Sequence, residues 1–416
     1  MRVAIIGSGI SGLAAGWYLS RRHEVSLFEK EPRLGGHTNT VIVENGGNPI
    51  PMDTGFIVHN DRTYPNLVRL FAELGVETQP SDMSFSVSCR RTGFEYSSRG
   101  INGYFAQRSN LLRREHYLLL AEILRFNRTA PRLLDRPGAE SATIGDVIDE
   151  GRYHKVFTDR YLFPMASAVW SMSLDSIRSF PALTLLRFFH NHGMLGIDTH
   201  PKWKVIRGGS HKYIPLLSAP FKERIFPDAH ITSVSRREGG VTLNFAGRPA
   251  MNFDQVVFAC HGDEVLPLLE RPTNAERDVL GSFKTSRNLA TLHTDSSLLP
   301  SHPSARASWN YNLGLSGKSA VAVTYHMNRL QSLQTAEDYC VTLNGEDAID
   351  GAKVLSKIVY HHPLYTREAV RAQERWSEIS GRNRTHYCGA YWFYGFHEDG
   401  LNSALRVASS QWSVSP

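Results

Sequence analysis

The sequence has few cysteines, four in 416 residues, and they are scattered along the chain. They form no Cys-x-x-Cys pair, which excludes the common zinc-site pattern and a disulfide framework. We therefore expect no metal site and a protein of the reducing cytoplasm. The four positions are Cys89, Cys260, Cys340 and Cys388.

Long apolar runs are also missing. No stretch of about 18 apolar residues occurs, so the sequence predicts no membrane-spanning helix. The N-terminus does not resemble a signal peptide, because an apolar strand begins almost at once. No nucleic-acid motif is present, and we expect no nucleic-acid partner. A chain of 416 residues with 41% hydrophobic and 21% charged residues is typical of a globular protein with two domains.

The net charge is +6, and part of it is concentrated in residues 99–135. This segment is rich in arginine and leucine and predicts a basic amphipathic helix over residues 111–134. Two interpretations stay open: a solvated helix face, or peripheral contact with an anionic membrane surface or an acidic acyl headgroup. The arginines are Arg99, Arg108, Arg113, Arg114, Arg125, Arg128 and Arg132.

A glycine-rich turn lies between two short apolar runs near the N-terminus. The runs are Val3–Ile6 and Val25–Phe28, and the turn reads Gly-x-Gly-x-x-Gly before a helical pattern. This context predicts a dinucleotide site: one glycine permits the turn, one admits a pyrophosphate and one allows close helix packing. An acid at the end of the second strand is placed to bind a ribose hydroxyl. A glycine-rich turn without a ligand is the other interpretation. The residues concerned are Gly7, Gly9, Ser11, Gly12 and Glu29.

The segment after Glu29 resembles the second cofactor motif of a large FAD-dependent family. That family includes monoamine oxidases, protoporphyrinogen oxidase and carotenoid desaturases. The resemblance rests on Arg33, Gly35 and Gly36. It implies that the arginine lies behind the pyrophosphate, which a guanidinium can bind with two hydrogen bonds. It also implies that the glycines line the channel beneath the flavin. His37 stands where many relatives have another arginine.

Further segments resemble the same family in the same order along the chain. Asp53, Thr54 and Gly55 resemble the Asp-x-Gly segment that returns to the flavin ring, although an ordinary Asx turn fits as well. Val234 matches the valine whose backbone holds the adenine. Ala259 matches a small residue where the closing strand passes near the cofactor.

The C-terminal run from Gly395 to Gly400 resembles the element that caps the flavin with a helix N-terminus, whose dipole stabilises negative charge on the reduced ring. The resemblance implies that Glu398, Asp399 and Gly400 lie close to the cofactor. The acid that relatives carry after an earlier glycine is replaced by Ala390.

The resemblance covers nearly the whole chain and implies an α/β protein with amine-oxidase-like topology. A Rossmann-like FAD-binding domain over residues 1–75, 202–265 and 386–416 would be interleaved with an α+β substrate-binding domain over 76–201 and 266–385. Within the latter, residues 163–170 suit either a packed core or an apolar substrate tunnel. After the strand at residues 40–43, Pro49 and Pro51 predict a returning strand that is short and starts late.

The residues of these motifs resemble those of a bacterial branch of the same FAD-dependent family. Members of that branch tend to accompany methyltransferases of the cyclopropane fatty-acid synthase type. One activity in that branch is desaturation of a methylated unsaturated fatty acyl chain on the way to furan fatty acids. The resemblance thus implies an acyl-lipid substrate, hydride transfer to flavin N5, and a methyltransferase as functional partner. Candidate bases for the accompanying proton removal are His397, Glu398, Tyr391 and His59.

Two other functions stay open. A flavin amine oxidase needs an aromatic cage, which Tyr391, Trp392 and Tyr394 are able to supply. A flavin-binding lipid carrier or methyltransferase partner without turnover is the third hypothesis. The sequence fixes neither the electron acceptor, nor the oligomeric state, nor whether FAD is covalently bound.

Overall fold

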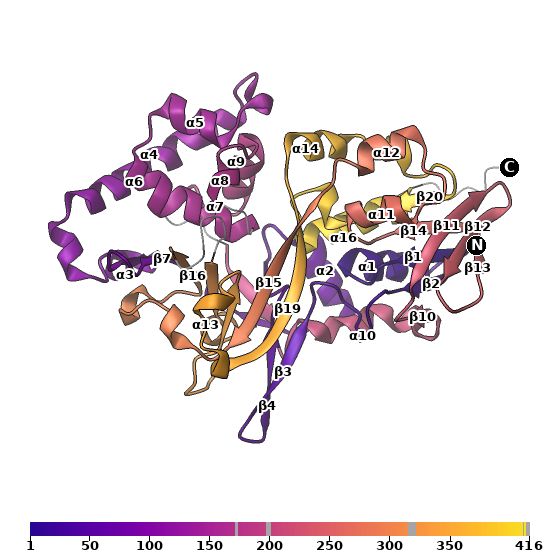
Figure 1. Ribbon diagram of the computed structural model, residues 1–416, viewed down its shortest axis with the longest axis horizontal. Helices are drawn as coiled ribbons and strands as arrows, with labels where there is room; N and C mark the ends of the chain where they lie inside the picture. The colour runs from indigo at the N-terminus through magenta and orange to yellow at the C-terminus, as the bar shows by residue number, and fades with distance from the viewer. Residues whose placement is uncertain (171–173, 197–200, 315–321, 411, 413–416) are drawn as a thin grey trace.

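The computed structural model describes residues 1–170, 174–196, 201–314, 322–410 and 412. A parallel sheet with its helices lies at one end, together with the N-terminus (Figure 1). A large mixed sheet crosses the middle, and a helical lobe forms the other end.

The parallel sheet has five strands in the order β10-β2-β1-β14-β20. Its central strands are almost fully buried, which explains why they are continuous apolar runs. Helices α1 (Ile10–Leu19) and α16 (His397–Ser409) pack together beside it. The strands are β1 (Arg2–Ile6), β2 (Glu24–Phe28), β10 (Ile225–Phe226), β14 (Gln255–Phe258) and β20 (Thr385–Tyr387).

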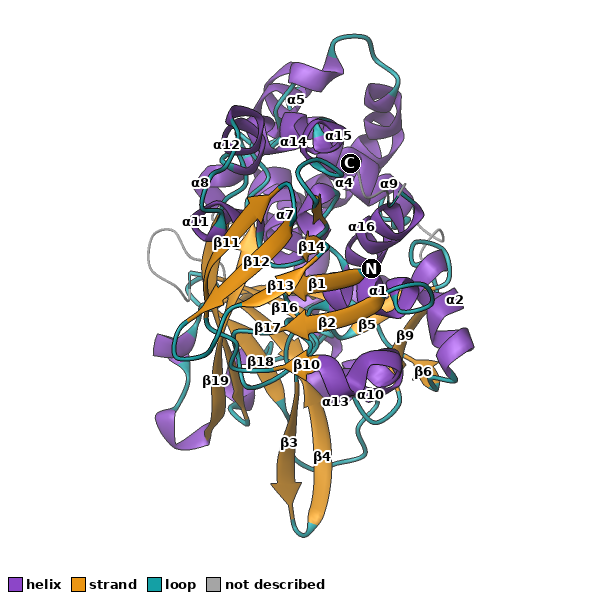
Figure 2. Ribbon diagram, turned by 90° about the vertical axis from the view of Figure 1, so that its right-hand side faces the viewer, coloured by secondary structure: helices purple, strands orange, loops and turns teal. Residues whose placement is uncertain are grey.

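A three-stranded antiparallel sheet lies next to the parallel one (Figure 2). It consists of β11 (Ile231–Arg237), β12 (Gly240–Phe245) and β13 (Met251–Phe253). The chain then passes through Asp254 and joins the parallel sheet as β14.

The middle layer is a seven-stranded sheet in the order β19-β15-β18-β17-β16-β7-β8. A small sheet of β5 (Val58–Asn60), β9 (Trp203–Ile206) and β6 (Thr78–Pro80) is also present. The predicted domain bounds stay a prediction, and residues 171–173, 197–200, 315–321, 411 and 413–416 within them lie outside the described residues. The seven strands are β7 (Phe85–Cys89), β8 (Phe94–Ser97), β15 (Thr285–His293), β16 (Trp309–Leu313), β17 (Ala322–His326), β18 (Cys340–Leu343) and β19 (Val354–Pro363).

The helical lobe is built around aromatic side chains, including Phe126, Phe157 and Phe188. The helix predicted from residue 111 begins at Arg114, because Arg108–Leu112 forms a 3-10 turn. None of the described helices combines the length and the apolar character needed to cross a bilayer. The lobe contains α3 (Gly100–Tyr104), α4 (Arg114–Leu134), α5 (Ile144–Gly151), α6 (Lys155–Phe157), α7 (Phe163–Trp170), α8 (Leu174–Ile177) and α9 (Ala182–Asn191).

The remaining described helices lie around the sheets. They are α2 (Pro65–Leu74), α10 (Tyr213–Ser218), α11 (Gly262–Leu268), α12 (Asn274–Leu280), α13 (Met327–Leu330), α14 (Arg367–Glu374) and α15 (Trp376–Ile379).

The hairpin of β3 (Thr40–Asn45) and β4 (Asn48–Asp53) projects from the body of the molecule (Figures 1 and 2). The prediction of a short, late returning strand is wrong, because β4 pairs along its whole length, with Glu44 opposite Pro49 and Ile42 opposite Pro51. Both prolines occupy positions whose nitrogen faces the open edge of a two-stranded sheet, so no ladder hydrogen bond is lost.

A buried ion pair ties three parts of the parallel-sheet region together. Arg236 on β11 forms a two-pronged pair with Glu276 on α12, and both side chains are nearly inaccessible to solvent. The Tyr387 hydroxyl on β20 donates to the same carboxylate at 2.7 Å. The charges are therefore compensated by hydrogen bonds as well as by each other.

We expect Glu276→Ala to lower the free energy of unfolding by about 3–5 kcal/mol, because it leaves the Arg236 guanidinium buried and unpaired. Denaturant unfolding of the purified variant measures the change. Glu378→Ala is the matched control, since its pair with Arg375 is exposed and its loss should leave the unfolding midpoint unchanged. Equal effects of the two substitutions would contradict a structural role for the buried pair.

Candidate cofactor and active site

The first glycine-rich turn is shaped by close packing at two of its glycines. A Cβ on Gly12 would lie 1.9 Å from the Gly7 carbonyl oxygen, and Gly7 itself has a φ of +107°. A Cβ on Gly7 would meet the Ala259 backbone at 2.8 Å. Gly9 differs: its backbone is extended, and a Cβ there would meet nothing within 4 Å. Gly9 therefore borders open space at the carboxyl end of β1, where ligands of parallel sheets bind.

Ser8 joins this turn to two other predicted cofactor segments. Its backbone N–H and its hydroxyl donate to Glu29 at 2.9 and 2.6 Å. The Gly35 N–H donates to the Ser8 hydroxyl oxygen at 3.1 Å. The structure thus brings the first turn, the end of β2 and the second glycine pair together. Sequence reasoning missed Ser8, although its place between two motif glycines was a signal.

Arg33 holds the second glycine turn in shape. Its guanidinium donates to the carbonyl oxygens of Leu34, Gly36 and Thr38 at 2.8–3.0 Å. The side chain remains largely exposed beyond these bonds. Gly36, with a φ of +56°, would place a Cβ 3.2 Å from the Gly9 Cα, so the two glycine turns lie against each other.

The first turns of α1 and α16 touch. A Cβ on Gly400 would lie 2.7 Å from the Ile10 side chain and 2.9 Å from the Ser11 hydroxyl oxygen, so only glycine allows this contact. No side chain caps the N-terminus of α1, which begins after Gly9. Its free N–H groups and positive dipole end favour an anionic ligand.

The Asp-x-Gly segment lies at the base of the projecting hairpin. Asp53 is fully buried and accepts hydrogen bonds from the Thr40 hydroxyl and from the backbone and hydroxyl of Ser210. Burial raises the pKa of Asp53 to about 6. The Thr54 hydroxyl lies 2.8 Å from the Tyr360 hydroxyl, and a Cβ on Gly55 would meet a backbone oxygen at 2.2 Å. Asp53 therefore anchors the Ser210 turn to the hairpin.

The two acids at the start of α16 are helix caps. Glu398 accepts from the backbone N–H groups of Asn66 and Leu67 at 2.9 and 2.8 Å, at the N-terminus of α2. Asp399 accepts from the Phe396 N–H at 2.9 Å, and burial raises its pKa to about 7. The catalytic assignment of Glu398 stays a prediction, and both of its oxygens are occupied by these bonds.

His397 and His59 belong to a buried group beneath the start of α16. The His397 ring stacks on Phe56 at 3.6 Å, and its Nε2 lies 2.9 Å from the Thr38 hydroxyl oxygen. Burial lowers the pKa of His397 to about 3 and that of His59 to about 4, so both are neutral at pH 7. His59 packs against Phe71, and its Nδ1 has no hydrogen-bond partner among the described residues.

Tyr391 and Trp392 are core residues in this structure. Their rings pack against Phe283 at 4.7 and 4.8 Å, and burial raises the pKa of Tyr391 well above its ordinary value. The two rings are tilted by 37° instead of facing each other in parallel across a gap. An aromatic cage is therefore not assembled from this pair, and the Tyr391 hydroxyl has no partner among the described residues.

Val234 and Ala259 are buried, and their cofactor contacts stay a prediction. Val234 is buried in β11, and its carbonyl oxygen accepts from the Glu270 N–H at 3.2 Å. The loop before β11 meets the end of β2, where the Ala229 N–H donates to the Glu29 carbonyl oxygen. Ala259 directly follows β14, and its Cβ would lie 3.2 Å from a Cβ on Gly12.

A histidine group that the sequence did not predict lies beside the second glycine turn. The His37 ring is 4.9 Å from Tyr360, 5.3 Å from His362 and 5.9 Å from His261. Burial and the neighbouring imidazoles lower the pKa of His37 well below 6.5, and its Nε2 has no partner among the described residues. The group does not form a metal site in the described part of the chain. The position of His261 just after β14 was the only signal in the sequence.

The helical lobe meets the site through aromatic rings. Phe396, directly before α16, stacks on Phe188 of α9 at 4.8 Å. Tyr365 belongs to the same apolar cluster as Phe188 and Phe189. The side of the site that faces the lobe is therefore apolar and aromatic.

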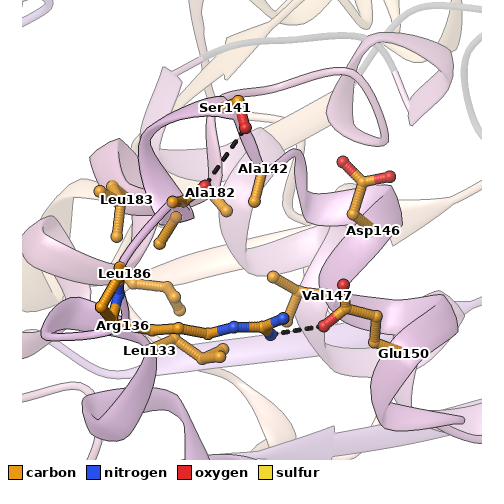
Figure 3. A pocket seen from close by; sticks show the side chains of 13 residues that line it. Leu133, Arg136, Ser141, Ala142, Asp146, Val147, Glu150, Ala182, Leu183 and Leu186 are labelled. Carbon is orange, nitrogen blue, oxygen red and sulfur yellow. Dashed lines mark hydrogen bonds and ion pairs between the residues drawn. The ribbon is translucent and has the colours of Figure 1, made fainter.

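The lobe also holds a pocket of about 190 Å³ between α4, α5 and α9 (Figure 3). Arg136 and Glu150 form an ion pair at its floor, with Leu133 and Leu186 beside them. All of its lining residues belong to the lobe, so this pocket is separate from the glycine turns.

Comparison with known proteins shows one family match and several solved structures with a similar fold. Residues 10–293, more than half of the chain, match the flavin-containing amine oxidoreductase family. The fold is similar to cyclohexylamine oxidase from Brevibacterium oxydans, with 14% identity, 98% of each chain covered and a TM-score of 0.68. It is also similar to a CLA-producing fatty acid isomerase from P. acnes, with 16% identity, coverage of 98% of this chain and 97% of that one, and a TM-score of 0.70.

Matches to curated sequences are short. A segment of 76 residues is 36% identical to the carotenoid phi-ring synthase of Chlorobaculum tepidum and covers 18% of this chain. The two curated relatives that the chain matches align over only 9% and 12% of their own lengths.

The residues present fit FAD. Open space at Gly9 admits a pyrophosphate, and the uncapped N-terminus of α1 favours its charge. Glu29 directly follows β2, where an acid would bind the ribose. The unpartnered Nε2 of His37 lies next to the glycine turn that contacts Gly9.

Substitutions at Gly9 and Gly12 should distinguish an effect on FAD binding from an effect on the stability of the fold. We expect Gly9→Ala to keep the melting temperature of the apoprotein but to weaken FAD binding at least about ten-fold, because its Cβ enters the space for the pyrophosphate. Gly12→Ala should instead lower the melting temperature, because its Cβ collides with the Gly7 carbonyl. Calorimetric titration with FAD and thermal unfolding measure both; wild-type FAD affinity in Gly9→Ala would contradict the site.

The apoprotein should lose stability as the pH falls from 6.5 towards 4. Buried histidines whose pKa is lowered to about 3 or 4 stay neutral in the folded chain but take up protons when it unfolds, so acid favours unfolding in this window. Asp53 and Asp399 have raised pKa values, so their protonation favours the folded chain as the pH falls. These two acids are outnumbered by the six histidines named below. The denaturant midpoint at pH 5 should lie below that at pH 7, and a higher midpoint would contradict these pKa shifts. The histidines are His59, His192, His293, His362, His386 and His397.

Proposed function

Because the chain belongs to the flavin-containing amine oxidoreductase family and is an FAD-dependent oxidoreductase, we propose that it desaturates a methyl-branched unsaturated fatty acyl chain. The observation that carries the proposal is the aromatic contact between Phe396 and Phe188. It joins the start of α16 to an apolar cluster in the lobe, an environment that suits an acyl chain better than a cation.

The names of two similar proteins support a lipid substrate. One protein with this fold is a fatty acid isomerase, and the segment match is to a carotenoid synthase. A methyltransferase of the cyclopropane fatty-acid synthase type, which would supply the methyl branch, is the functional partner we propose.

In this reaction the substrate loses a hydride from an allylic carbon and a proton from the neighbouring carbon. FAD, when bound, supplies the acceptor for the hydride, and oxygen or a redox partner then takes up the electrons. The protein holds the acyl chain in place and keeps water out, roles that suit the rings of Phe56 and Phe396.

The proton acceptor is assigned among the four candidate bases by their surroundings. His397 and His59 are neutral imidazoles at pH 7, which is the form that accepts a proton, but the burial that lowers their pKa values to about 3 and 4 also makes them weak bases. Both carboxylate oxygens of Glu398 are occupied by the backbone of α2, and Tyr391 packs against Phe283 in the core. We therefore place the role on His397 or His59.

Oxidation of a lipophilic amine is the second candidate function. The similarity of the fold to cyclohexylamine oxidase favours it. The packing of Tyr391 and Trp392 against Phe283 weighs against it, because two of the three rings expected for an ammonium cage are engaged in the core.

The test is an anaerobic visible spectrum of the FAD-loaded protein. We expect detergent-dispersed phospholipid with a methyl-branched monounsaturated chain to bleach the longer-wavelength flavin band, because hydride transfer reduces the ring. Cyclohexylamine and the same phospholipid without the double bond should leave the band unchanged. Bleaching by the amine alone would replace the desaturase with an amine oxidase, and no bleaching by either would favour a carrier without turnover.

A further inference from the structure

Exposed apolar side chains gather on one part of the helical lobe. Most large hydrophobic residues that are exposed in the described chain lie between Ile101 and Leu124. Leu112 is 90% exposed and Ile101 is 79% exposed. Single exposed hydrophobic residues are ordinary, but a group on consecutive elements marks an interaction surface. The group, here called the lobe patch, comprises Ile101, Leu111, Leu112, Tyr117 and Leu124.

The part of the lobe patch on α4 forms a single stripe. Arg114, Tyr117, Ala121, Leu124 and Arg128 are exposed and recur at intervals of three or four residues, which places them on one face of the helix. The opposite face is buried in the lobe through other residues. The exposed stripe is therefore not needed to anchor α4.

The arginines around the lobe patch carry uncompensated charge. Among the described residues, no carboxylate lies within ion-pairing distance of these guanidinium groups. Two of the three acids in residues 99–135 are engaged elsewhere: Glu115 pairs with Arg160 at 3.0 Å and Glu122 with Arg125 at 2.6 Å, whereas Asp135 follows α4 and is exposed. The exposed arginines are Arg99, Arg108, Arg113, Arg114, Arg128 and Arg132.

We propose that the lobe patch docks on an anionic lipid bilayer. Leucine, isoleucine and tyrosine side chains bordered by unpaired arginines are complementary to an interface with acyl chains below and phosphate groups at the surface. The patch lies on α3 and α4 and the turn between them, at the end of the molecule opposite the N-terminus (Figure 1). This inference goes beyond the proposed function, since it concerns where the protein works and not what it oxidises.

In the docked orientation, apolar side chains would lie between the bilayer and the cofactor site. Phe126 on the buried face of α4 belongs to the same apolar cluster as Phe188, and Phe188 stacks on Phe396 before α16. Apolar packing is thus continuous from the membrane-facing helix to the cofactor site.

The test is flotation of the FAD-loaded protein with lipid vesicles. We expect binding to vesicles that contain phosphatidylglycerol, weaker binding in high salt, and little binding to phosphatidylcholine alone. Arg113→Glu/Arg114→Glu should lower the partition coefficient about five-fold or more per residue, from about 1 kcal/mol per basic residue near an anionic surface. Ile101→Glu/Leu112→Glu should lower it at least about ten-fold, because it removes apolar insertion.

Matched controls carry the same changes on other surfaces. Ile42→Glu/Leu355→Glu alters exposed apolar residues of the hairpin and β19, and Arg367→Glu/Arg371→Glu reverses two exposed charges on α14. Both should bind vesicles like the wild type. Equal losses in controls and patch variants, or equal binding to neutral vesicles, would overturn the proposal.

Two further measurements distinguish a failure of the docking proposal from a failure of the desaturase proposal, and lipid docking from self-association. Flavin reduction by detergent-dispersed substrate should be the same in Ile101→Glu/Leu112→Glu and wild type, so a failed desaturase assay does not affect the docking result. Gel filtration at high protein concentration tests for self-association. A dimer that this variant abolishes, without vesicle binding by the wild type, would overturn the proposal in favour of a second copy of the chain.

Discussion

The hydrogen bonds between Glu29 and Ser8 are the constraint on which the cofactor site depends. One buried carboxylate oxygen accepts both the backbone and the hydroxyl of Ser8, which also receives the Gly35 N–H. Three turns from different parts of the N-terminal region are thereby fixed at the carboxyl ends of the parallel strands. Without the acceptor, a buried N–H and hydroxyl would be left unsatisfied, and the two glycine turns would lose their common anchor.

Buried acids elsewhere in the site follow a related principle. Glu398 and Asp399 are close in sequence and in space, which disfavours two negative charges. Each is stabilised by backbone N–H groups at a different helix N-terminus, Glu398 at α2 and Asp399 at α16. The start of α16 is thus held from both sides, so the element expected to cap the flavin has a fixed position.

The sequence predicted the parts of the site that depend on local geometry. Gly7, Gly9 and Gly12 follow from steric rules for a strand, a turn and a helix, and the family, fold class and FAD cofactor expected from the motifs are confirmed. The histidine group was not predictable, because His37, His261 and His362 meet only through the tertiary fold. The hydrogen bond from the Asn66 N–H to Glu398 could not be predicted either, since the two residues are 332 positions apart in the chain. The pairing of β4 was missed because the direction of each proline nitrogen depends on the hairpin register.

The contact between Gly400 and the first turn of α1 has a consequence for how the protein is made. Residues 10–12 are synthesised long before Gly400 and the rest of α16, the helix that completes their surroundings. One edge strand of the parallel sheet, β20, is synthesised shortly before α16. A nascent chain therefore exposes an unfinished nucleotide crevice until α16 has left the ribosome, and stable cofactor capture has to wait for that helix.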